Sequence, residues 1–166
     1  MTLTARLARL RVPLGFAFAV IVFLVARPTR TTMIAGVLIA CAGEGIRWWA
    51  AGHVEKGREV TSSGPYRWTR HPLYVGSAVI GIGLGVASHS WLAATIVALY
   101  LLATLTAAIR TEEAWLRATF GDEYRAYCEG RTVRREFSAS RALRNREERA
   151  VAGLAIGLLL LALKMT

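Results

Sequence analysis

The sequence is poor in the residues that build disulfide frameworks and metal sites. Its two cysteines, Cys41 and Cys128, lack the close spacing of a metal or redox motif, and Cys41 lies in an apolar run. The three histidines, His53, His71 and His89, are scattered along the chain. These scarcities argue against a disulfide-stabilised fold and a zinc site, and we expect no bound metal.

Lysine and acidic residues are also scarce, whereas arginine is not. The 166 residues include 19 Arg, 2 Lys and 11 Asp or Glu, for a net charge of +10. At the same time 54% of the residues are hydrophobic and the mean hydropathy is +0.39. Apolar spans joined by basic loops explain this combination better than a nucleic-acid-binding surface, so we expect membrane lipids and no nucleic acid as partners.

Five apolar runs predict an all-α, polytopic integral-membrane helix bundle of about five spans with short cytosolic helices. We treat residues 1–166 as one domain with a motif-bearing core (64–128), a basic linker (129–149) and a C-terminal apolar helix (150–164). The first run is predicted to be an uncleaved anchor, because no small-x-small cleavage site follows it. The last is short, so it is either a tilted span or an interfacial helix. The runs are 12–26, 33–51, 73–88, 91–109 and 150–163.

Two of these runs carry notable side chains. Glu44 and Arg47 interrupt the second run at i,i+3 spacing, which places both on one helical face. Charges inside a span are functional or paired, and both interpretations stay open here. In the third run, Gly81 and Gly85 form a G-x-x-x-G pair that predicts close approach of a neighbouring helix.

A very short turn at residues 88–90 makes the third and fourth runs an antiparallel hairpin. The hairpin should bring Glu112 and Glu113 beside Arg70 and His71, about forty residues away in the sequence. This end of the bundle would collect 17 basic residues and the other end 3, so the positive-inside rule predicts that it faces the cytosol. The expected location is the cell inner membrane or an endomembrane.

Residues 64–76 form a shaped loop that ends at a helix. Pro65 and Pro72 fix the backbone, and Pro72 suits the first position of the following helix. Arg70 and His71 would then lie at the helix N-terminus, where anions bind favourably. With the acid pair, they would suit a ligand that carries both charges. A plain salt-bridge network or a loop that touches lipid headgroups would use the same residues.

At these residues the sequence resembles a known family. Residues 64–76 read Gly-Pro-Tyr-x-x-x-Arg-His-Pro-x-Tyr-x-Gly, and residues 112–127 read Glu-Glu-x-x-Leu-x-x-x-Phe-Gly-x-Glu-Tyr-x-x-Tyr. This pair of motifs is similar to the isoprenylcysteine carboxyl methyltransferase family, whose relatives include bacterial phospholipid methyltransferases. The resemblance implies an integral-membrane enzyme that uses S-adenosyl-L-methionine without a Rossmann domain, and the chain has no G-x-G-x-x-G motif after a strand.

By motif position, the resemblance also implies roles for individual residues. Arg70 would orient an acidic acceptor, and Glu112 would share the catalytic site or help Glu113 to hold the amino group of the cofactor. A general base, if the acceptor needs one, could be Glu112, Tyr66 or His71. Contacts with the cofactor are implied for Tyr66, His71, Pro72, Tyr74, Gly76 and Glu113.

The resemblance leaves the acceptor open, because a carboxylate, a thiol and a phospholipid amine all remain candidates for the lipophilic substrate. The chain also departs from the family pattern after the second motif, where Arg134-Arg135-Glu136-Phe137 stands in place of an expected proline. Two alternatives keep the architecture: a sterol-reductase-like enzyme that binds NADPH, and a non-catalytic protein that binds anionic lipid. The oligomeric state is not predicted.

Overall fold

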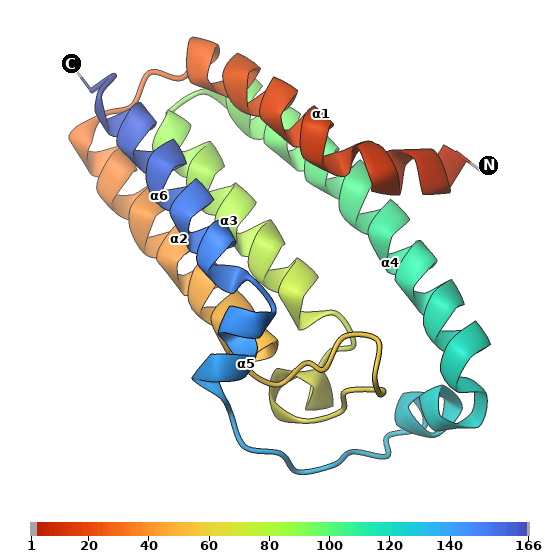
Figure 1. Ribbon diagram of the computed structural model, residues 1–166. Helices are drawn as coiled ribbons and strands as arrows, with labels where there is room; N and C mark the ends of the chain where they lie inside the picture. Colours follow the sequence, from red (N-terminus) through yellow and green to blue (C-terminus); the bar gives the residue numbers. More distant parts are fainter. Residues whose placement is uncertain (1–2, 166) are drawn as a thin grey trace.

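The computed structural model describes residues 3–165, with side chains from residue 14 onward. Helices account for all regular structure in this part of the chain, which contains no strand. The five longer helices run alternately in opposite directions along the bundle (Figure 1). The elements are α1 (Leu3–Val25), α2 (Arg30–Ala51), the 3-10 turn η1 (Gly64–Arg67), α3 (Pro72–Ser88), α4 (Trp91–Cys128), α5 (Ala139–Arg144) and α6 (Glu147–Ala162).

Two helices, α2 and α4, are long and apolar enough to cross a membrane. The Leu14–Val25 part of α1 and the helix α3 (Pro72–Ser88) are shorter apolar helical segments. The predicted class, a helical membrane protein, is therefore supported, and the number of five spans stays a prediction. The basic start of the chain continues directly into α1 from Leu3. Residues 1 and 2 of that start lie outside the described part.

The closest helix packing joins α2 to α3 through reciprocal glycine contacts. A Cβ atom on Gly43 would lie 2.8 Å from the carbonyl oxygen of Gly76, and one on Gly76 would lie 2.7 Å from that of Gly43. Gly36 and Gly83 repeat this contact seven residues along each helix, at 2.5 and 2.7 Å. The two backbones therefore touch at two levels, which only small residues permit.

The predicted G-x-x-x-G pair contacts a different neighbour. A Cβ atom on Gly81 would meet the side chains of Leu101 and Val97, and one on Gly85 would lie 3.4 Å from Ala94. Both glycines thus face α4 rather than α2. Helix α3 consequently has small residues on two faces and lies between its two neighbours in the chain.

Caps and turns fix one end of the bundle. Thr29 and Thr32 form a capping box that starts α2, and the Ser90 hydroxyl accepts from the Ala93 amide to start α4. The Arg27 amide donates to the Ser88 carbonyl at 2.8 Å, which ties the two turns together. The tight turn predicted at residues 88–90 is confirmed.

The other end of the bundle is built from loops and from the bent end of α4. Gly121 has φ 40° and ψ −108°, which interrupts the regular helix. After this kink the chain turns back under the bundle (Figure 1), and Tyr127 donates its hydroxyl to the Tyr66 carbonyl at 2.7 Å. The bend at Gly121 therefore allows the segment with the second motif to contact the loop with the first motif.

The glycine contacts predict how α2 tolerates substitution. Gly43→Leu should force α2 and α3 apart and destabilise the protein by about 1–3 kcal/mol, because side-chain atoms have no room between the two backbones. Thermal unfolding in detergent would measure the change. Gly45→Ala is the matched control on the same helix, since no atom lies within 4 Å of its added Cβ. Equal effects of the two substitutions would contradict the packing described here.

Candidate active site

The loop that carries the first motif has a shape that its sequence imposes. Gly64 takes φ +56°, and a Cβ there would lie 2.5 Å from the ring of His53, so the position requires glycine. Pro65 is the second residue of η1, and Pro72, fully buried, is the first residue of α3. His71 is thereby held just before the N-terminus of α3.

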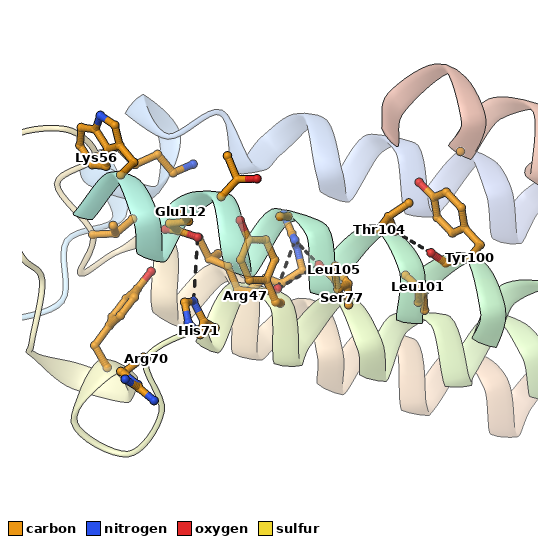
Figure 2. Close-up of a pocket in the computed structure, with 18 of the residues that line it drawn as sticks. Arg47, Lys56, Arg70, His71, Ser77, Tyr100, Leu101, Thr104, Leu105 and Glu112 are labelled. Atoms are coloured by element: carbon orange, nitrogen blue, oxygen red, sulfur yellow. Dashed lines mark hydrogen bonds and ion pairs between the residues drawn. The ribbon is translucent and has the colours of Figure 1, made fainter. Parts of the chain in front are cut away.

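His71 and Glu113 join the two motifs directly. The ring Nε2 lies 3.0 Å from Glu113 Oε1. An ionised carboxylate only accepts hydrogen bonds, so Nε2 carries the hydrogen in this contact. Nδ1 is buried without a hydrogen-bond partner among the described residues and lies 3.9 Å from Glu112 Oε2 (Figure 2). Tyr74 stacks on the same ring at a centroid distance of 5.8 Å.

Glu113 lies beyond the apolar part of α4, in a ring of positive groups. Arg117 contacts its Oε2 at 3.1 Å and Arg70 approaches its Oε1 to 3.9 Å. The hydrogen bond from His71 lowers the pKa of Glu113 below its ordinary value, with a further contribution from Arg70. The structure confirms that the hairpin brings Glu112 and Glu113 beside Arg70 and His71, as the sequence predicted.

A cavity of about 980 Å³ lies beside this pair, between α1, α3 and α4. Its polar end is lined by Tyr66, Arg70, His71, Tyr74 and Glu112. Its other end is largely apolar, with Phe16, Ala19, Leu101, Leu105 and Ala108 in the wall. One cavity therefore offers charged groups at the loop end and hydrocarbon contacts deeper in the bundle.

Three predicted site residues lie outside the cavity wall. Glu113 does not line the cavity itself but contacts His71, which does. Pro72 is buried at the start of α3, and Gly76 faces α2 through its contact with Gly43. These positions indicate supporting contacts for Pro72 and Gly76, whereas the cofactor roles implied by the resemblance remain predictions.

The cavity also contains polar residues that sequence reasoning did not place in the site. Arg47, Lys56 and Ser77 line it, together with Trp115. Arg47 carried a signal, because a charge within an apolar run is functional or paired. Lys56, Ser77 and Trp115 carried none, since their positions depend on how the loop and helices pack.

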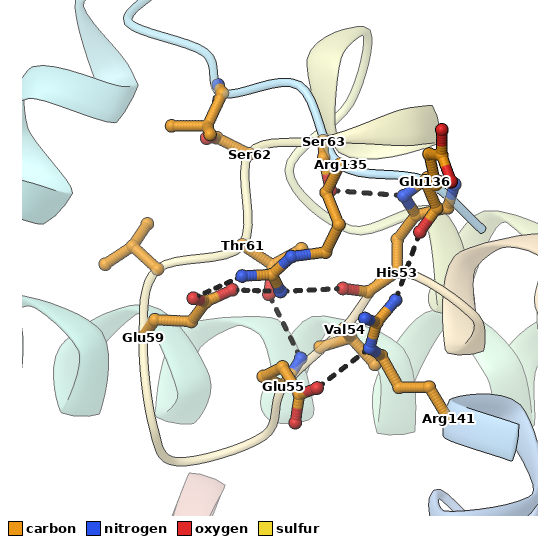
Figure 3. Close-up of polar contacts among 12 residues, drawn as sticks. His53, Val54, Glu55, Glu59, Thr61, Ser62, Ser63, Arg135, Glu136 and Arg141 are labelled. Carbon is orange, nitrogen blue, oxygen red and sulfur yellow. Dashed lines mark hydrogen bonds and ion pairs between the residues drawn. The ribbon is translucent and has the colours of Figure 1, made fainter. Parts of the chain in front are cut away.

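The basic linker predicted at residues 129–149 packs against the loop that borders the cavity. We call residues 131–146 the strap. Arg141 Nε contacts Glu55 Oε1 at 2.8 Å, and Arg135 forms an ion pair with Glu59 (Figure 3). The Val133 amide donates to the Ser62 hydroxyl at 3.0 Å. The strap thus neutralises the acids of the 52–63 loop.

Backbone contacts complete this attachment. Asn145 donates through Nδ2 to the carbonyls of Ala51 and Val54, both at 2.9 Å. Arg141 Nη1 donates to the Gly52 carbonyl at 2.5 Å. Since Val54 also lines the cavity, the strap fixes one wall of the site from outside.

A helical bundle with two helices long and apolar enough to cross a membrane, and with a cavity that is polar at one end, is consistent with a membrane protein that has a candidate ligand site. A sequence model of the phospholipid methyltransferase family matches residues 31–123, which is more than half of the chain. The chain belongs to this family. The matched range begins at α2 and reaches the kink of α4, so it contains both His71 and Glu113.

Three curated proteins are similar over part of the chain. The nickel-cobalt-cadmium resistance protein NccN of Alcaligenes xylosoxydans is 37% identical over 92 residues, 54% of this chain and 42% of its own. The cobalt-zinc-cadmium resistance protein CzcN of Cupriavidus metallidurans is 36% identical over 87 residues, 51% of this chain and 39% of its own. The protein-S-isoprenylcysteine O-methyltransferase of Schizosaccharomyces pombe is 30% identical over 86 residues, 52% of this chain and 36% of its own.

The chain thus spans about two fifths of the length of these relatives. The family and the yeast relative support methyl transfer at a membrane. No solved structure matches the chain. Among residues 3–165, no group of three His, Cys, Asp or Glu side chains could hold a metal ion.

The strap predicts an acid-sensitive cavity wall. The hydrogen bond from Arg141 lowers the pKa of Glu55 from its ordinary value of 4.5. The ion pair therefore contributes fully above pH 4.5 and is lost as the pH falls through the lowered pKa. Glu55→Gln should speed amide hydrogen exchange in residues 52–63 at neutral pH. In the wild-type protein, exchange in the same residues should become faster when the pH falls below 4.5, after correction for intrinsic exchange rates.

The matched control is Glu129→Gln, which makes the same charge change at an exposed site next to the strap. It should leave exchange in residues 52–63 as in wild type. If Glu55→Gln exchanges like this control at neutral pH, the strap does not hold the loop.

Proposed function

We propose that this protein transfers a methyl group from S-adenosyl-L-methionine to a lipophilic acceptor at the cytosolic face of a membrane. The observation that carries the proposal is the hydrogen bond between His71 and Glu113, because it joins the two motifs at the polar end of the cavity. Membership of the phospholipid methyltransferase family supports the reaction class.

The residues at this end fit the cofactor. The buried Nδ1 of His71 has no hydrogen-bond partner and can accept one from a ligand. Glu112, with 45% of its side chain exposed, can take an ammonium group, and Arg70 can take an anionic oxygen. Tyr66 is almost fully buried and offers a hydroxyl, whose burial raises its pKa and keeps it neutral.

When bound, S-adenosyl-L-methionine supplies an electrophilic methyl group on a sulfonium centre. The protein has to orient the acceptor and exclude water. Tyr74 and Leu73 of α3 and Trp115 of α4 provide bulky walls around the polar groups. A carboxylate or thiolate acceptor needs no general base, whereas an amine can pass a proton to Glu112.

Two features support a lipophilic acceptor and a cytosolic site. The apolar end of the cavity is lined by α1 and α4, whose exposed side chains Phe16, Leu99 and Leu102 suit hydrocarbon surroundings. The loop 52–71 and the segment 110–149 lie at one end of the bundle (Figure 1) and carry most of the basic residues. The positive-inside rule then supports a cytosolic orientation.

Binding of S-adenosylhomocysteine, the product form of the cofactor, tests this proposal. Calorimetry on purified protein in detergent should detect binding. His71→Ala and Glu113→Gln should each weaken it roughly 5- to 150-fold, as expected for losing about 1–3 kcal/mol from a charged hydrogen bond. Glu129→Gln, an exposed change of the same charge, should bind like wild type. A labelled-methyl assay against lipids extracted from the host would then identify the acceptor class.

The two alternatives predict different results. A sterol-reductase-like enzyme would bind NADPH tightly and show no response to S-adenosylhomocysteine. A protein that only binds anionic lipid would bind neither NADPH nor S-adenosylhomocysteine, and His71→Ala would leave its lipid binding unchanged. Either outcome would overturn the methyltransferase proposal.

A further inference from the structure

Arg47 is fixed in the cavity wall by contacts with two other helices. Its Nη1 donates to the Ser77 hydroxyl at 2.6 Å and to the Leu73 carbonyl at 3.4 Å, both on α3. Its Nη2 lies 2.6 Å from Glu147 Oε1, in the first turn of α6. Figure 2 shows Arg47 beside Ser77 along the cavity. The guanidinium therefore has a defined orientation before any ligand binds.

Helix packing alone does not require this ion pair. The Glu147 side chain is only 4% exposed, and burying a carboxylate and a guanidinium removes both from water. Replacing such a pair by apolar residues is often neutral or stabilising. Because the pair is not needed for packing, a function in ligand binding explains why these charges lie within apolar helices. Arg47 borders the cavity, where such a function is possible.

The guanidinium still has hydrogen-bonding capacity for a ligand. Of its five N–H groups, those on Nη1 donate to Ser77 and Leu73, whereas Nη2 forms an ion pair with Glu147 Oε1, which accepts no hydrogen bond among the described residues. The Nε–H group faces Glu44 Oε2 at 3.8 Å, beyond hydrogen-bond distance. A planar fork with free N–H groups is suited to a carboxylate or phosphate oxygen.

We propose that Arg47 binds an anionic oxygen of the ligand in this cavity, and that Glu147 of α6 is the residue that positions its guanidinium. The proposal rests on the proposed methyl transfer and names a further binding residue for that site. The oxygen belongs either to the carboxylate of the methyl donor or to an acidic group of the acceptor. Helix α6 lies outside the family match at 31–123, so Glu147 comes from a segment that the family model does not cover.

Four ligands separate the two sources of the anion. S-adenosylhomocysteine carries the donor carboxylate, and 5′-methylthioadenosine lacks it. Dodecanoate carries an acidic head on a hydrocarbon chain, and dodecanol lacks the charge. Calorimetry in detergent would measure the binding of each to wild type, Glu147→Gln, Arg47→Lys and Ser77→Ala, the last of which loosens Arg47 without changing any charge.

If Arg47 binds the donor, Glu147→Gln and Arg47→Lys should weaken S-adenosylhomocysteine binding about 10- to 150-fold and leave 5′-methylthioadenosine within twofold. If it binds the acceptor, dodecanoate should lose affinity by the same factor and dodecanol should not. Ser77→Ala should shift the same ligand in the same direction by a smaller factor. Either pattern supports the proposal.

Glu148→Gln is the matched control, because it neutralises the next residue of α6, which is exposed. It should bind all four ligands like wild type. If the Arg47, Glu147 and Ser77 variants also bind all four like wild type, the ion pair only holds helices together and the proposal is wrong. If wild type binds neither adenosine compound, the proposed methyl transfer fails as well.

Discussion

The contact between the backbones of α2 and α3 sets the geometry on which the rest of the structure depends. Because glycines face each other at two levels, the helices approach closely enough for Arg47 of α2 to reach Ser77 and Leu73 of α3. The same helix α3 presents His71 at its N-terminus. Bulkier residues at the contact would separate the groups that line the cavity. The close packing of α2 and α3 is therefore required for the geometry of the site.

Turn and proline rules applied to the sequence predicted the loop and the hairpin that form the polar end of the site. The prolines shape the loop, and the turn at residues 88–90 makes a hairpin. The hairpin brings His71 and Glu113 together because it returns the chain to the end that it left. Periodicity and turn chemistry therefore sufficed to predict this contact across forty residues.

The remaining features depend on packing that no local pattern encodes. The G-x-x-x-G pair was correctly expected to contact a helix, but the pattern could not say that α4 is its partner. The sequence identified the run 129–149 as a basic linker but not its partners, and in the structure its arginines pair with Glu55 and Glu59. Similarly, Glu147 acquires a role only because α6 returns beside α2 and places it on Arg47.

The strap and α6 are made after the loop and the helix α2 that they contact, and this affects how the protein is assembled in a cell. The ribosome finishes the 52–63 loop about 5–15 s before it reaches Glu147, at roughly 5–20 residues per second. Until then Glu55, Glu59 and Arg47 lack their partners from the C-terminal segment. The cavity wall is therefore completed only once α6 has been made, and a chain that stops before α6 carries both motifs without a finished pocket.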